Sequence, residues 1–333
     1  MKKKISILTI LILILSILIY FILSKNNFFK SEDINQNKDL TKIILSNKSI
    51  CEKCPNGVKE VQLEKKGEKW YVNNKYKANK NQINILLETI KKMTIKRPVG
   101  VNERSNILKR LDTQRTKVEL IKNSDTIKTI LVGGNTADQL GTYMIIKDSL
   151  NNEPYVFHID GFNGYLNSRF SCEESTWIDK TIFNLSKKEI SKIELNYLDD
   201  NNKSFWIEKS NSSKIILKTN NEILTKIDSS FSLNYFKNFE KIYCEKILNN
   251  NSNFNVKDII KRRPFFEIKI TLESDSILLL KGIRKNSSER GRTMNSKYDT
   301  ERFYGYIDST LLLIQYQKFD KILMSLNDFL IEN

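Results

Sequence analysis

An unbroken apolar run near the start of the sequence, Ile5–Leu23, constrains what the rest of the chain can become. The run contains no charged residue and follows three lysines, Lys2, Lys3 and Lys4. A helix of this length spans roughly 28 Å, close to the hydrocarbon thickness of a bilayer. Its last residues are bulky, no small-residue cleavage pattern follows, and its basic flank favours a cytoplasmic N-terminus. We therefore expect residues 1–4 in the cytoplasm, an uncleaved signal anchor at residues 5–23 of the inner (cytoplasmic) membrane, and an extracytoplasmic (periplasmic) remainder.

The composition describes a folded, basic protein. Hydrophobic residues make up 40% of the 333 residues, enough for ordinary hydrophobic cores, and the formal net charge is +16. This charge would suit an anionic partner such as a lipid surface or a polyanion. The lysines are interspersed with acids along the chain, however, which favours an ordinary solvated surface. A nucleic-acid partner would also conflict with the expected topology.

Histidine and cysteine usage restricts the chemistry. His158 is the single histidine, so a histidine triad, a histidine-rich metal site or a Cys–His pair would all depend on it. We predict no catalytic residue, no metal site and no cofactor. Cys51 and Cys54 have redox or metal spacing, but the turn residues Pro55, Asn56 and Gly57 follow them. We favour a structural disulfide or idle thiols, and leave open a metal site with a distant partner and a redox module.

The remainder of the chain predicts a linker and two units. Residues 24–57 are expected to be the linker, residues 58–185 the first unit, and residues 186–333 a second, more divergent unit. In the first unit, Val58–Leu63 and Lys69–Val72 read as half-buried strands. Asn79 then predicts the start of a helix whose apolar residues recur at helical spacing: Ile83, Leu86, Leu87, Ile90 and Met93.

The second unit repeats this order of elements. Ile190–Leu195 matches the first strand and Ser204–Ile207 the second, which places Trp70 and Trp206 in corresponding positions as core anchors. A helical stripe again follows. The later segments also match in pairs, namely 117–121 with 266–270, 129–132 with 276–280, 141–144 with 291–294, and 155–160 with 303–308. Each unit reads as two strands, a helix and a three-stranded meander. The expected fold class is α+β, an N-terminal transmembrane helix followed by a tandem repeat of two similar antiparallel-sheet-plus-helix units.

Several stretches of the first unit resemble the family known as domain of unknown function 4340 (DUF4340), especially its membrane-anchored form from Bacteroidetes-type bacteria. These stretches are 67–78, 132–144, 158–169 and 177–183. The resemblance implies a β-rich extracytoplasmic domain with no established activity, and an accessory role in membrane complexes of the gliding-motility or ABC-transporter type. Asp160 stands where relatives often have proline, a difference expected to loosen the turn after His158. The Cys51/Cys54 pair is not part of the family pattern.

Two glycine-rich segments of the first unit are the candidate binding loops. Glycines permit positive φ, so the first segment is expected to present backbone N–H groups as an anion-binding nest, and the second to do likewise beside His158 and Arg169. The alternative is that these glycines only make the turns of a meander. The candidate residues are Gly133, Gly134, Thr136, Asp138, Gly141, His158, Gly161, Asn163, Gly164 and Arg169. In the second unit, the charged segment 284–292 is expected to be a solvated loop, with contact to anionic headgroups as the alternative.

These observations lead us to expect a non-enzymatic accessory or interaction subunit, anchored by one helix and contacting a protein partner in the envelope. The alternative is a hydrolase or carbohydrate-active enzyme that uses carboxylates such as Asp138, Asp160 or Glu119. No spacing in the sequence selects an acid/base pair among them.

Overall fold

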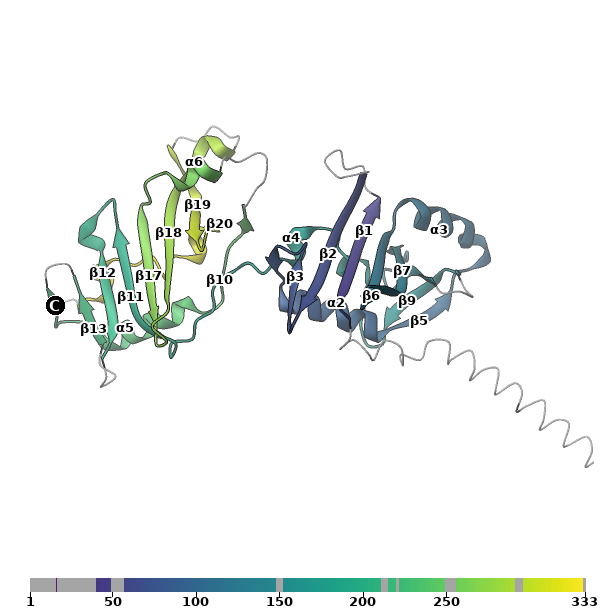
Figure 1. The fold of residues 1–333 in the computed structure, drawn as a ribbon, viewed down its shortest axis with the longest axis horizontal. Coiled ribbons are helices and arrows are strands. Elements are labelled where there is room, and N and C mark those ends of the chain that lie inside the picture. Colours follow the sequence, from purple (N-terminus) through teal and green to yellow (C-terminus); the bar gives the residue numbers. More distant parts are fainter. Residues whose placement is uncertain are drawn as a thin grey trace, which may run out of the picture. The chain divides into compact units, whose positions relative to one another are not determined.

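The computed structural model describes Ser16 and residues 40–48, 57–147, 152–210, 215–219, 222–248, 256–290 and 296–331. Apart from Ser16, the expected anchor lies outside these residues, as do Cys51 and Cys54. Within the described part of the chain, no helix has both the length and the hydrophobicity to cross a bilayer. The chain divides into two compact units, Met1–Asp179 (unit 1) and Lys180–Asn333 (unit 2), so the boundary falls earlier than expected (Figure 1).

Unit 1 is built on a nine-stranded antiparallel sheet with the order β4-β3-β2-β1-β6-β7-β8-β9-β5. Its strands are β1 Lys42–Lys48, β2 Val58–Lys66, β3 Lys69–Val72, β4 Tyr76–Lys77, β5 Met93–Pro98, β6 Thr116–Lys122, β7 Asp125–Asn135, β8 Thr142–Lys147 and β9 Tyr155–Ile159. The meander from β6 to β9 therefore has four strands where three were expected. After β9 the chain forms the short helices η3 (Asn167–Arg169) and α4 (Glu174–Trp177).

Strand β1 corrects the expected linker. It lies within residues 24–57 and pairs with β2 on one side and β6 on the other, so the linker prediction is wrong for Lys42–Lys48. The strand is central because Ile43 and Leu45 are fully buried on one face of the sheet. The alternation of buried and exposed residues in β1 was not recognised in the sequence, because the residues before this strand are mostly polar.

Two helices cover unit 1 from different sides of the sheet. Helix α2 (Lys80–Lys92) begins as predicted, because the Asn79 side chain accepts hydrogen bonds from the N–H groups of Asn81 and Gln82 at 3.0 and 3.2 Å. Helix α3 (Val101–Thr113), which the sequence did not predict, packs on Leu131, Tyr143, Ile145 and Val156 with its Ile107 and Leu111. Because side chains alternate along a strand, the buried Ile130 and Val132 face the opposite side, so both faces of β7 are covered.

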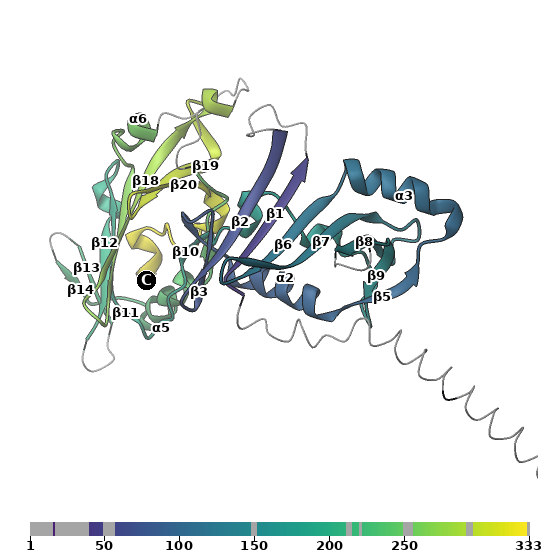
Figure 2. The same cartoon turned by 45° about the vertical axis from the view of Figure 1, so that its right-hand side comes forward.

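Unit 2 is also built on a nine-stranded antiparallel sheet, ordered β14-β13-β12-β11-β17-β18-β19-β20-β16. The sheet curves around α5 and the C-terminal segment (Figure 2), whose Phe319, Ile322 and Phe329 belong to the core. A separate two-stranded sheet joins β10 (Thr181–Phe183) to β15 (Ile242–Tyr243). The remaining elements are β11 Ile190–Tyr197, η4 Asn201–Lys203, β12 Phe205–Lys209, β13 Ile215–Lys218, β14 Ile223–Leu224, α5 Ser229–Tyr235, η5 Phe236–Phe239, β16 Lys246–Ile247, α6 Val256–Ile260, β17 Phe266–Leu272, β18 Ile277–Asn286, η6 Ser287–Arg290, β19 Tyr298–Ile307, β20 Thr310–Gln315, η7 Tyr316–Lys318 and η8 Leu326–Phe329.

The two sheets follow one strand order, with β1, β2 and β3 in the positions of β11, β12 and β13. The predicted correspondence between the two units is wrong by one strand here, since it equated the strand at Val58 with the strand at Ile190. Trp70 lies in β3 and Trp206 in β12, so the two tryptophans do not correspond, and both are only partly buried. The correspondence of β6 with β17 and of β7 with β18 agrees with the prediction. Residues 303–307 of the predicted segment 303–308 lie in β19, which has the position of β8 rather than β9.

Candidate functional site

The first candidate segment is not a loop at its start. Gly133 and Gly134 belong to β7, and neither has positive φ, so the predicted nest of left-handed glycines is wrong. The β7–β8 register shifts between Val132 and Asn135, which places both glycines at a β-bulge. A Cβ atom on Gly133 would lie 2.7 Å from Leu111 Cδ2 and 3.1 Å from the Tyr143 carbonyl oxygen. Glycine is therefore needed at position 133 for the close approach of α3, and not for a turn.

The β7–β8 loop that follows is closed by its own hydrogen bonds. The Thr136 N–H donates to the Gly141 carbonyl at 2.9 Å, and the Gln139 N–H donates to the Thr136 carbonyl at 2.9 Å. Asp138 accepts from the Thr136 hydroxyl and, at 3.0 Å, from the Leu140 N–H. These hydrogen bonds, led by that from Thr136, lower the pKa of the Asp138 carboxyl. Asp138 thus stabilises the loop as a carboxylate.

The turn after β9 carries His158 and Asp160. The Phe162 N–H donates to the Ile159 carbonyl at 3.0 Å, and Gly161 adopts a φ of +77° within this turn. His158 Nε2 lies 3.3 Å from Asp160 Oδ1. The turn is therefore closed despite the aspartate at position 160, which provides a partner for the histidine that proline would not.

Arg169 holds the second segment against α2. Its guanidinium donates to the hydroxyl of Thr89, a fully buried residue, at 2.9 Å and lies 4.3 Å from the centre of the Phe162 ring. The Leu166 N–H in turn donates to the Thr142 hydroxyl at 2.7 Å. Gly164 has a φ of +157°, and a Cβ there would come within 3.0 Å of the Phe162 ring. Asn163 is exposed.

The two candidate segments meet at one end of the sheet. Thr142 pairs with Phe157, and His158 pairs with Thr94 of β5. Lys96, two residues further along β5, lies 3.3 Å from the Leu140 carbonyl and 4.0 Å from Asp138 Oδ2 through its Nζ atom. A Cβ on Gly141 would clash with Val156. This end of the sheet thus gathers Thr136, Asp138, Gly141, His158 and Gly161, but it leaves Gly133 and Gly134 on the side of α3.

Glu119 lies away from this end. It pairs with Thr129, six residues before Asn135 along β7, which corresponds to roughly 20 Å of strand. Carboxylate pairs of glycosidases are only about 5–9.5 Å apart. Glu119 therefore does not form an acid/base pair with Asp138.

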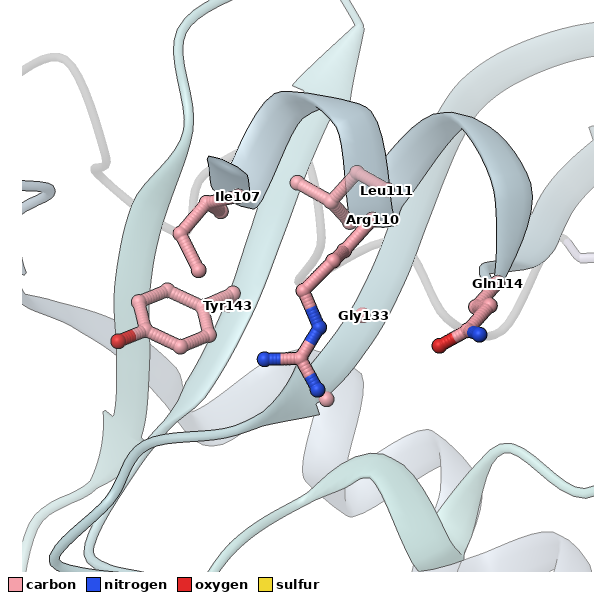
Figure 3. A pocket seen from close by; sticks show the side chains of 7 residues that line it. Ile107, Arg110, Leu111, Gln114, Gly133 and Tyr143 are labelled. Carbon is pink, nitrogen blue, oxygen red and sulfur yellow. The ribbon is translucent and has the colours of Figure 1, made fainter. Parts of the chain in front are cut away.

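A pocket of about 70 Å³ lies between α3 and the β7–β8 bulge. Its lining residues are Ile107, Arg110, Leu111, Gln114, Gly133, Gly134 and Tyr143. Figure 3 shows the Arg110 side chain extending from α3 toward Gly133, with the Tyr143 ring on one side and the Gln114 amide on the other. Sequence reasoning named the two glycines but missed the other five residues. The available signal was the i, i+4 spacing of the apolar residues Ile107 and Leu111.

Tyr143 separates the pocket from a charged cluster. Its hydroxyl donates to Glu103 Oε2 at 2.9 Å, and Glu103 Oε1 lies 3.7 Å from Arg97. Burial, followed by the hydrogen bond to Glu103, raises the pKa of Tyr143. The tyrosine hydroxyl is therefore engaged, and its ring forms a pocket wall.

The remaining predictions concern cysteines, metals and the charged segment of unit 2. Cys172 and Cys244 are both buried, and burial raises the pKa of the Cys172 thiol. The Cys51–Cys54 disulfide remains a prediction, since both residues lie outside the described ranges. Within those ranges, no three histidine, cysteine or acidic side chains cluster as metal ligands. Residues 284–286 belong to β18 rather than to a loop, and 291–295 lie outside the described residues.

Comparison with known proteins identifies a family. The sequence model of the family described as Domain of unknown function (DUF4340) matches residues 70–253, more than half of the 333-residue chain. The match begins within the expected family domain at 58–185 and continues into unit 2. No curated protein and no solved structure matches the chain. From the extent of the family match, the chain belongs to the DUF4340 family.

Proposed function

We propose that this protein is a non-enzymatic, single-pass protein of the inner membrane and an accessory or interaction subunit of an envelope complex. The apolar run Ile5–Leu23 and the three lysines before it support an anchor with a cytoplasmic N-terminus. The resemblance to membrane-anchored Bacteroidetes-type members of the family supports a complex of the ABC-transporter or gliding-motility kind. The shared strand order of the two sheets supports their origin as a tandem repeat.

One observation carries the non-enzymatic part of the proposal. The polar side chains best suited to chemistry in unit 1 are engaged in fixing their own segments. Asp138 closes its loop through Thr136 and Leu140, and Arg169 ties the post-β9 segment to Thr89 of α2. Groups used in this way give a rigid surface for a partner.

The location is tested with a reporter fused after Asn333. Alkaline phosphatase is active only outside the cytoplasm, so we expect an active fusion in the membrane fraction. Leu13→Arg combined with Leu15→Arg should abolish both the phosphatase activity and the recovery in the membrane fraction, because each central arginine costs about 2.5–3.5 kcal/mol in a spanning helix. Leu13→Ala with Leu15→Ala is the matched control. An inactive wild-type fusion, or one released into the soluble fraction, would reject the anchored topology.

The partner is tested by co-purification of the full chain in mild detergent at native expression. We expect envelope proteins to be recovered in constant proportion with the wild-type chain. Recovery of the chain alone would reject the role of interaction subunit.

The alternative function, a carboxylate-dependent hydrolase, retains one supporting observation. Asp138 and Asp160 lie at the same end of the sheet as His158, and Asp160 is 82% exposed in its side chain. Hydrolysis of envelope glycans that is lost in both Asp138→Asn and Asp160→Asn, but not in Asp125→Asn, would favour the enzyme over the interaction subunit.

A further inference from the structure

The pocket between α3 and the β7–β8 bulge combines an arginine with a stretch of backbone that lacks side chains. We propose that this pocket binds the C-terminal carboxylate of a partner polypeptide, with the partner's last side chain against the apolar walls. The inference rests on the proposed function and deepens it, because it names the chemistry by which unit 1 holds its partner.

Arg110 supplies the charge. The other arginines in the described part of unit 1 have partners: Arg97 lies 3.7 Å from Glu103, Arg104 pairs with Glu153, Arg115 lies 3.0 Å from Asp112, and Arg169 bonds to Thr89. Arg110 has no acidic or hydroxyl partner among the described residues, and it lines the pocket. A guanidinium presents a planar fork of donors that matches a carboxylate.

The negative groups around the pocket are neutralised. The pocket lies near the C-terminal end of α3, where helix carbonyls carry partial negative charge that opposes an anion. Arg115 covers this end, since its Nη1 atom donates to the carbonyls of Leu111 and Asp112 at 2.8 and 3.0 Å. Glu103 is engaged by Tyr143 and Arg97. Arg110 is thus the uncompensated charge on the lining.

The size suits a carboxylate and a short side chain. A volume of about 70 Å³ exceeds the roughly 10–15 Å³ that one water needs, so these two groups of a chain end fit. Ile107, Leu111 and Tyr143 provide apolar walls. Gly134 has no atom within 4 Å of a would-be Cβ, which leaves the bulge backbone accessible.

The test uses the full-length protein in mild detergent and two peptides, acetyl-Gly-Gly-Gly-Val with a free carboxylate and the same peptide as an amide. Saturation-transfer NMR on the peptides measures weak binding directly. We expect the carboxylate peptide to bind at least about ten-fold more tightly than the amide, because hydrogen bonds to charged groups contribute this much. Arg110→Gln should remove the preference, and Arg110→Lys should retain part of it.

Lys109→Gln is the matched control, since it removes the same charge from an exposed position of α3 that does not line the pocket. Equal binding of the two peptides, or equal weakening by Lys109→Gln and Arg110→Gln, would overturn the inference. Binding of isovalerate without binding of the peptide would overturn the assignment to a chain end. If envelope proteins co-purify as well with Arg110→Gln as with the wild type, this inference fails while the proposed function stands.

Discussion

Units 1 and 2 each have a bulge between equivalent strand pairs, with the additional residues in β7 of unit 1 and in β19 of unit 2, and they fill it differently. In unit 1 the bulge between β7 and β8 consists of Gly133 and Gly134, and the thirteen-residue α3 leaves a pocket above it. In unit 2 the register shifts between Arg284 and Asn286 of β18, and the covering helix, α6, has five residues. Tyr143 and Tyr304 occur in the corresponding apolar clusters beneath the two helices.

The bulge of unit 2 is occupied by an ion pair. Lys285 Nζ lies 3.1 Å from Asp299 Oδ2, and the two side chains are only 6% and 0% exposed. Asp299 Oδ1 also accepts the N–H groups of Glu301 and Arg302 at 2.9 and 3.1 Å. The comparison teaches that a bulge between equivalent strands can have two uses. In unit 2 it holds a buried ion pair of the chain itself, and in unit 1 it leaves Arg110 and the bulge backbone for the proposed ligand.

The largest expected effect tests the filled bulge. Asp299→Ala leaves the Lys285 ammonium buried without its partner, so the free energy of unfolding should fall by about 3–5 kcal/mol. Urea denaturation of the full chain measures this loss. Asp199→Ala, which removes the exposed partner of Arg284, should cost less than about 1 kcal/mol. Similar losses in the two variants would show that the Lys285–Asp299 pair is not the element that distinguishes unit 2.

A smaller effect tests the open bulge. Gly133→Ala places a Cβ against Leu111 and the Tyr143 carbonyl, and overpacking of this kind should cost about 1–3 kcal/mol. Gly134→Ala meets no atom within 4 Å and should change the free energy of unfolding by less than about 0.5 kcal/mol. Thermal melting of both variants gives the comparison. If the two alanines were equally costly, close approach of α3 would not explain the glycine at position 133.

The smallest effect concerns the β7–β8 loop beside the bulge. The pKa of Asp138 is lowered in the folded protein, so its stabilisation is present above the unfolded-state pKa of about 4 and is lost as pH falls through the folded pKa. We expect Asp138→Asn to lower the melting temperature at pH 7 and to match the wild type more closely at pH 3. Asp125→Asn, on another exposed hairpin of the same sheet, serves as the control. A difference as large at pH 3 as at pH 7 would contradict this role of Asp138.

Sequence reasoning predicted elements whose patterns are local. Helix α2 was predictable because Asn79 caps it and Ile83, Leu86 and Ile90 recur on one face. Helix α3 was missed because only Ile107 and Leu111 are buried in its thirteen residues, which leaves a weak periodic signal. Strand β1 was missed because it lies between two polar stretches and because one of its two partners, β6, is distant in sequence.

The site was harder to predict than the fold. Gly133 and Gly134 occur where a turn or a bulge would equally explain two adjacent glycines, and only strand register separates the two. The sequence does not distinguish Arg110 from the other arginines of the unit, because its role depends on which of them form ion pairs with acidic residues in the folded structure. The sequence did not predict that Asp138 and His158 lie at one end of the sheet, because this depends on the strand register, which brings the β7–β8 loop beside the end of β9.

The buried thiols give each unit an internal reporter of its own opening. Cys172 belongs to unit 1 and Cys244 to unit 2, and each is hidden in the folded state. An alkylating reagent reaches either sulfur only when the surrounding structure unfolds locally. The raised pKa of Cys172 slows its reaction further, because less of the thiol is present as thiolate. In a Cys51→Ser/Cys54→Ser background, the rates of labelling at these two sites would time the local unfolding of the two halves separately within one sample.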